Sequence, residues 1–135
     1  MELGTFGAIL RFAMQMEEQS AAFYEAASGA APALRELGQG ARKRLARLEQ
    51  ARREGVAEMI LESITGLDGD AYAVTLDPRA DAAALRAQAQ EQEEAAARFY
   101  RDAAAKLPIR EVARLFQRLA QEHESASLQV GEEAA

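Results

Sequence analysis

Two stretches of this chain, 76 positions apart, carry nearly the same helix-forming pattern. Residues 13–24 and 89–100 are identical at six positions, and both stretches end in Phe-Tyr. A weaker echo relates Leu45-Ala46 to Leu119-Ala120, 74 positions further on. An internal repeat indicates that one structural unit is used twice. We therefore predict two similar helical hairpins, the second shorter than the first by about two residues.

The spacing of apolar residues predicts where the helices lie. Apolar positions recur three and four residues apart over residues 5–27, 33–61, 81–105 and 109–130. All three prolines fall outside these segments, and Thr5 suits the N-cap of the first helix. We predict one all-α domain over residues 1–135, a four-helix bundle with hairpins over 5–61 and 81–130.

The segment over residues 62–80 has a different composition. It is rich in Gly and Asp, and its Asp77-Pro78 pair disfavours helix. We interpret it as a long crossover between the hairpins. The tail, residues 131–135, is expected to fray.

Composition excludes several classes of function. The chain has no cysteine, which removes disulfides, thiol nucleophiles, cysteine-based zinc sites and rubredoxin-type iron centres. Its net charge of −6 argues against nucleic acid as a partner, and the basic run over residues 42–44 is interpreted as a solvated helix face. No apolar run is long enough to span a membrane, and no signal-peptide pattern is visible. We expect a cytoplasmic protein without membrane attachment.

Three glutamates lie on or beside the apolar faces of the predicted helices. Glu17 and Glu93 each follow an alanine of that face by four positions, and Glu49 follows Leu45 by four. A carboxylate turned towards a bundle interior is costly unless it is paired or bound to metal. Di-iron bundles use converging carboxylates, with Glu from two helices and Glu-x-x-His from the other two.

These motifs resemble those of rubrerythrin-like proteins in the ferritin-like superfamily. Glu17 and Glu93, each six residues before Phe-Tyr, resemble the signatures of the first and third helices. Leu45-Ala46 followed by Glu49, and Leu119-Ala120, resemble the openings of the second and fourth ligand helices. The resemblance covers nearly all of the chain. It implies a ferritin-like bundle, a homodimer, and a non-haem di-iron centre for oxidase, peroxidase or storage chemistry.

The chain also departs from the family pattern. Arg52 stands where a histidine would follow Glu49, and on the fourth helix either His123 or Glu122 takes the glutamate position. Neither frame puts a histidine three residues later, and the chain has one histidine in total. The remaining candidate metal ligands have oxygen or imidazole donors, which suit iron, manganese or zinc. They are Glu17, Glu49, Glu93, His123 and, tentatively, Glu122.

Two tyrosines are expected beside this candidate site. Tyr24 and Tyr100 follow Glu17 and Glu93 by seven positions, two helical turns further along the same face. We interpret them as packing residues whose hydroxyls can hydrogen-bond interior carboxylates.

The sequence leaves three functions open. The first is a metalloprotein with an incomplete di-iron site, which would need an external electron donor for redox turnover. The second is a metal-free interaction or scaffold bundle, in which Arg52, one turn from Glu49, replaces the charge of the metal and a protonated His123 adds a second cation. The third is a carrier of a small apolar or cationic ligand in the vacated centre. Metal content separates the first from the other two.

Overall fold

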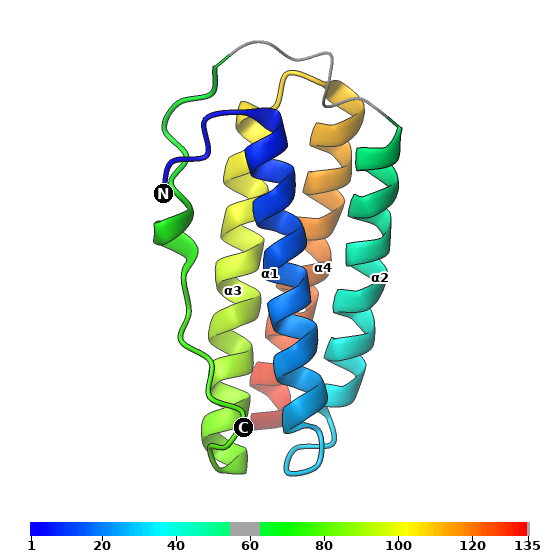
Figure 1. Cartoon of the computed structure of the whole chain (residues 1–135). Coiled ribbons are helices and arrows are strands. Elements are labelled where there is room, and N and C mark those ends of the chain that lie inside the picture. Colours follow the sequence, from blue (N-terminus) through cyan, green and yellow to red (C-terminus); the bar gives the residue numbers. More distant parts are fainter. Residues whose placement is uncertain (55–62, 135) are drawn as a thin grey trace.

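The part of the chain that the structure describes folds into four α-helices that pack as two hairpins (Figure 1). The computed structural model describes residues 1–54 and 63–134. Within these residues α1 (Phe6–Ala27) packs along α2 (Leu34–Arg53), and α3 (Ala82–Lys106) packs along α4 (Arg110–Ala134). No strand forms in the described part of the chain, so the predicted all-α arrangement of two hairpins and a long connection is confirmed.

Local sequence explains where the helices begin. The hydroxyl of Thr5 accepts a hydrogen bond from the amide of Ala8 at 3.0 Å, and the carboxylate of Asp81 accepts one from Ala84 at 2.9 Å. Each cap satisfies an amide that has no partner inside its helix. The predicted starts are therefore correct to within one residue.

Two predicted helix ends need comment. The predicted fraying of residues 131–134 is wrong, because α4 continues through Gly131 to Ala134, and residue 135 lies outside the described residues. A single glycine weakens a helix but does not end it when the residues before it are packed. The predicted second helix extends to residue 61, and residues 55–61 of that range lie outside the described residues.

The described part of the connection between the hairpins, residues 63–81, lies along the outside of the bundle beside α3 (Figure 1). This part contains a short 3-10 helix, η2 (Gly69–Tyr72). The amide of Leu3 donates to the carbonyl of Leu67 at 2.8 Å, and the hydroxyl of Tyr72 donates to Asp102 on α3 at 2.6 Å. These contacts fix the crossover to the N-terminal segment and to α3.

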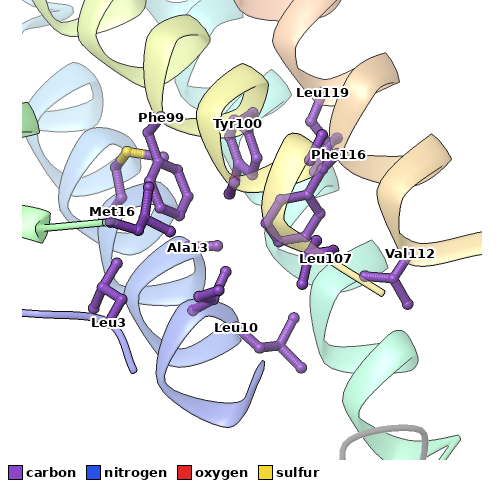
Figure 2. Packing of buried hydrophobic residues seen from close by; sticks show 14 of the residues in the cluster. Leu3, Leu10, Ala13, Met16, Phe99, Tyr100, Leu107, Val112, Phe116 and Leu119 are labelled. Atoms are coloured by element: carbon purple, nitrogen blue, oxygen red, sulfur yellow. The ribbon is translucent and has the colours of Figure 1, made fainter. Parts of the chain in front are cut away.

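The apolar core consists of two clusters with a polar layer between them. Figure 2 shows the larger cluster, in which Phe99, Tyr100 and Phe116 pack against α1. The smaller cluster gathers Phe23, Tyr24 and apolar residues near the opposite ends of the helices. No helix within the described residues is long and apolar enough to cross a lipid bilayer. The polar layer is the feature of this core that calls for a functional explanation.

Candidate functional site

Three ionisable side chains from three helices meet in the middle of the bundle. Glu17 on α1, Glu93 on α3 and His123 on α4 each have 0% exposed surface. The Nδ1 atom of His123 lies 2.8 Å from Oε1 of Glu93, and its Nε2 atom lies 2.9 Å from Oε2 of Glu17. The imidazole therefore joins two carboxylates that belong to different hairpins.

Helical spacing brings these three side chains inward. Glu17 shares a face of α1 with Ala13 and Ser20, all of them buried. His123 follows Leu119 by four positions on the buried face of α4. The polar residues occupy core positions of otherwise apolar stripes.

Two tyrosines hydrogen-bond the same carboxylates in a crossed pattern. Tyr24 on α1 donates to Oε2 of Glu93 on α3 at 2.6 Å, and Tyr100 on α3 donates to Oε2 of Glu17 on α1 at 2.5 Å. The ring of Tyr100 also stacks on the imidazole of His123, with centroids 5.5 Å apart and planes 13° from parallel. Burial and the neighbouring carboxylate charges raise the pKa of both tyrosines well above the ordinary value, so both hydroxyls stay protonated as donors.

A second cation reaches the layer from α2. The side chain of Arg44 is only 6% exposed, and its Nε atom donates to Oε1 of Glu17 at 3.0 Å. Burial disfavours the charged guanidinium, but the charges of Glu17 and Glu93 outweigh this effect and raise the pKa of Arg44 above its ordinary value. Arg44 stays charged and is the cation that α2 supplies to the centre.

The negative and positive charges of the four groups at the centre cancel. A histidine can donate from both ring nitrogens only as the imidazolium. Burial opposes that charge, but Glu17 and Glu93 overcome the opposition and raise the pKa of His123 to about 9. Burial likewise favours the neutral form of Glu17, and the cationic His123 and Arg44 instead hold the pKa of Glu17 below its ordinary value. Two carboxylates thus face two cations.

Sequence reasoning did not predict the role of Arg44. We interpreted the basic run over residues 42–44 as a solvated face, which describes the exposed Arg42 and Lys43. A signal was available, because Arg44 lies three residues after Ala41 and four before Leu48, both fully buried on α2.

A buried amide was also missed. Gln92 on α3 donates from Nε2 to the hydroxyl of Ser20 on α1 at 2.8 Å, and both side chains are buried. Gln92 precedes Glu93 on the inward side of the helix. This neutral bond extends the polar layer between the two hairpins.

The structure places the other predicted site residues outside the centre. Glu49 is only partly buried and lines a surface hollow between α1 and α2. It follows Arg44 by five positions, which turns it by about 140° on the helix. Arg52 is exposed, about 12 Å further along α2 than Arg44. Arg52 does not neutralise the central carboxylates, and Arg44 does.

On the fourth helix, His123 points into the bundle and Glu122 does not. Glu122 is 39% exposed, and its Oε2 atom lies 2.7 Å from Nη1 of Arg47 on α2. A contact of 3.6 Å joins its Oε1 atom to Nη1 of Arg44. Glu122 therefore links α4 to α2 at the surface.

The donor atoms present do not fit a di-metal centre. Both ring nitrogens of His123 face carboxylate oxygens at hydrogen-bonding distance, so the imidazolium has no lone pair for a metal. Among the residues that the structure describes, only Glu17 and Glu93 supply buried carboxylates, and the Arg44 guanidinium already binds one of them. Within residues 1–54 and 63–134, no three His, Asp or Glu side chains are arranged to hold a metal ion.

Comparison with known proteins found no match to any family model, any curated protein or any solved structure.

Proposed function

We propose that this chain is a metal-free bundle of the ferritin-like, rubrerythrin-like kind that serves as a binding or scaffold module. In this proposal the two hairpins and the crossover correspond to the ferritin-like arrangement. Ion pairs among Glu17, Glu93, His123 and Arg44 hold the centre that a metal pair occupies in di-iron bundles. In this proposal the protein functions by binding at its molecular surface and in its grooves.

The observation that carries this proposal is the position of His123. Its two ring nitrogens lie 2.8 and 2.9 Å from two buried carboxylates, so the ring acts as a cationic bridge. Arg44 adds the second positive charge at 3.0 Å. Charge-assisted hydrogen bonds of this length satisfy buried carboxylates without a metal ion.

A second candidate is a metalloprotein that uses the same residues. The observation that favours it is the convergence of Glu17, Glu93 and His123 from three helices. Metal binding there requires His123 to lose its extra proton, which the raised pKa opposes. It also places a divalent ion beside the Arg44 guanidinium, which like charges disfavour.

Metal loading tests the choice between these candidates. The protein is purified without chelators, loaded anaerobically with ferrous iron, desalted and analysed for iron per chain. We expect no retained iron in a folded protein. One or two irons per chain, lost in Glu17→Ala and Glu93→Ala but kept in the off-centre control Glu49→Ala, would overturn the proposal. Light scattering on the same sample checks the predicted homodimer.

The protonation of His123 gives an independent readout. We expect the imidazole nitrogen resonances of His123 to report an imidazolium at neutral pH, above the ordinary pKa of a histidine. A neutral ring with one unprotonated nitrogen would contradict the cationic bridge and would restore a lone pair for metal.

A further inference from the structure

A groove between α2 and α4 gives access to one group of the polar layer. Helices α2 and α4 make few contacts, and a cavity of about 180 Å³ lies between them. Among the described residues, Arg44 is the side chain that belongs both to this wall and to the central network. The wall residues are Ala33, Glu36, Leu37, Gly40, Arg44, Gln129 and Val130.

The guanidinium of Arg44 has unused donors on this side. Its Nε atom binds Glu17, but neither terminal nitrogen makes a hydrogen bond to any described residue. The contact of Nη1 with Glu122, at 3.6 Å, is longer than a hydrogen bond. An ideal Cβ at Gly40, on the groove wall, would lie 3.3 Å from Nη1 and 3.7 Å from Nη2, so both terminal nitrogens border the groove, while Nη1 also lies beside Glu122 in a neighbouring hollow.

Beside Arg44, the wall offers two apolar side chains to a short apolar chain, and the carboxylate of Glu36 lies at its exposed edge. Val130 is buried and Leu37 is partly buried at the wall, and the amide side chain of Gln129 adds a neutral donor. An ideal Cβ at Gly40 would lie 3.3 Å from Nη1 of Arg44, so the glycine keeps the space beside the guanidinium open. A dry cavity of about 150 Å³ accommodates benzene, so this one holds a ligand of about six heavy atoms.

We infer that this groove binds a small monocarboxylate with a short apolar chain. The carboxylate accepts hydrogen bonds from the two terminal nitrogens of Arg44, whose planar fork matches carboxylate geometry. The chain lies against Leu37 and Val130. This inference deepens the proposed binding role and rests on it, and it names the ligand class that this site takes.

The test is a titration of the full-length protein with butyrate, followed by amide NMR. Butyrate has a carboxylate, a three-carbon chain and six heavy atoms in all. We expect saturable shifts at Gly40, Arg44, Gln129 and Val130, with a dissociation constant of the order of millimolar. Chloride at matched ionic strength, 1-butanol and inorganic phosphate are the comparison probes.

Two variants keep the test decisive even though Arg44→Ala removes a partner of Glu17. Arg44→Lys retains a cation for Glu17 but lacks the planar fork, and Gly40→Ala retains Arg44 but crowds its terminal nitrogens. We expect each to weaken butyrate binding by about tenfold or more. Gln39→Ala, exposed on the same helix, is the matched control and should bind as the unmodified chain does.

The results that would overturn this inference differ from those that would overturn the proposed function. Equal shifts with chloride, shifts outside the groove, or unchanged binding in Gly40→Ala would overturn the inference. Tighter binding of phosphate than of butyrate would also overturn it, because phosphate has no chain to place on Val130. Retained iron would refute the proposed function separately, since the iron count does not depend on butyrate.

Discussion

The helix pair α1 and α3 kept the symmetry of the internal repeat at the centre, whereas α2 and α4 lost it. On the first pair, Glu17 and Glu93 are 76 positions apart, as are Tyr24 and Tyr100, and their hydrogen bonds cross symmetrically. On the second pair the cations come from unrelated positions. The offset of 74 that relates these helices pairs Arg44 with Arg118, which is exposed, and His123 with Glu49, which is partly buried.

The polar layer requires neutral overall charge more than it requires symmetric positions for the cations. Two buried carboxylates need neutralising partners, because an unpaired buried charge costs several kcal/mol. Neutralisation requires a positively charged side chain that is long enough to contact the carboxylates. It does not require that side chain to come from a particular helix position. Symmetric anions are therefore compatible with an arginine on α2 and a histidine on α4.

Removal of His123 should give the largest effect. We expect His123→Ala to lower the free energy of unfolding by about 3–5 kcal/mol, because both carboxylates lose a buried partner at once. Denaturant unfolding followed by circular dichroism measures it. His123→Gln, which keeps one donor, should cost less. A loss below about 1 kcal/mol in the alanine variant would mean that the two carboxylates do not depend on the imidazole.

The pH dependence of stability should come next. The folded state raises the pKa of His123 to about 9, so its contribution is complete below the ordinary value of 6.5 and is lost as pH rises from there through about 9. The loss should be about 3 kcal/mol. The pKa of Glu17 is lowered, so its contribution is present above the ordinary value of 4.5 and is lost as pH falls below it.

Unfolding measured between pH 4 and 9.5 should therefore show greatest stability between about 4.5 and 6.5. His123→Gln should flatten the decline on the alkaline side. A decline of the same size in that variant would assign the effect to another group.

Arginine variants on α2 and α4 test which arginine neutralises the central carboxylates. We expect Arg44→Ala to destabilise the fold by about 2–3 kcal/mol, because Glu17 loses one of two charged partners inside the core. Arg52→Ala and Arg118→Ala, both exposed, should change stability by less than about 0.5 kcal/mol. Equal losses in Arg44→Ala and Arg52→Ala would return the neutralising role to Arg52.

Among the variants of the polar layer, the two crossed tyrosines should each lose a single hydrogen bond and should lose similar amounts of stability. Tyr24→Phe and Tyr100→Phe each remove one hydrogen bond to a buried carboxylate, which should cost about 1.5–3 kcal/mol. The two losses should be similar if the repeat preserved function as well as sequence. Thermal and denaturant unfolding of both variants measures the two losses of stability. A difference above about 2 kcal/mol between them would show that the two hydrogen bonds are alike in geometry but not in energy.

Much of the fold followed from periodicity. The starts of all four helices lie within one residue of the predicted ones, since caps and apolar stripes are local properties. The end of α4 was missed because the packing of α4 on α3 carries the helix past Gly131. The inward positions of Glu17 and Glu93 followed from spacing and from resemblance, whereas the sequence left open whether His123 or Glu122 faces inward.

The spacing of residues along α2 did not correctly predict which of its arginines supplies the second cation. Both Arg44 and Arg52 lie near the apolar stripe of α2 by helical spacing, and the spacing from Glu49 predicts Arg52 as the cation. Arg44 is level with Glu17 in the assembled bundle, whereas Arg52 lies near the end of α2.

The helix starts, the repeated Glu and Tyr positions, and the lack of a full set of histidines can all be read from the amino-acid sequence. These are consequences of residue type and of spacing along one helix. The packing of the four helices is what places His123 between Glu17 and Glu93, lets Arg44 complete the charge balance, and leaves a groove open beside Arg44. Those contacts join helices that are distant in the chain, and helical periodicity does not fix how one helix is positioned along another.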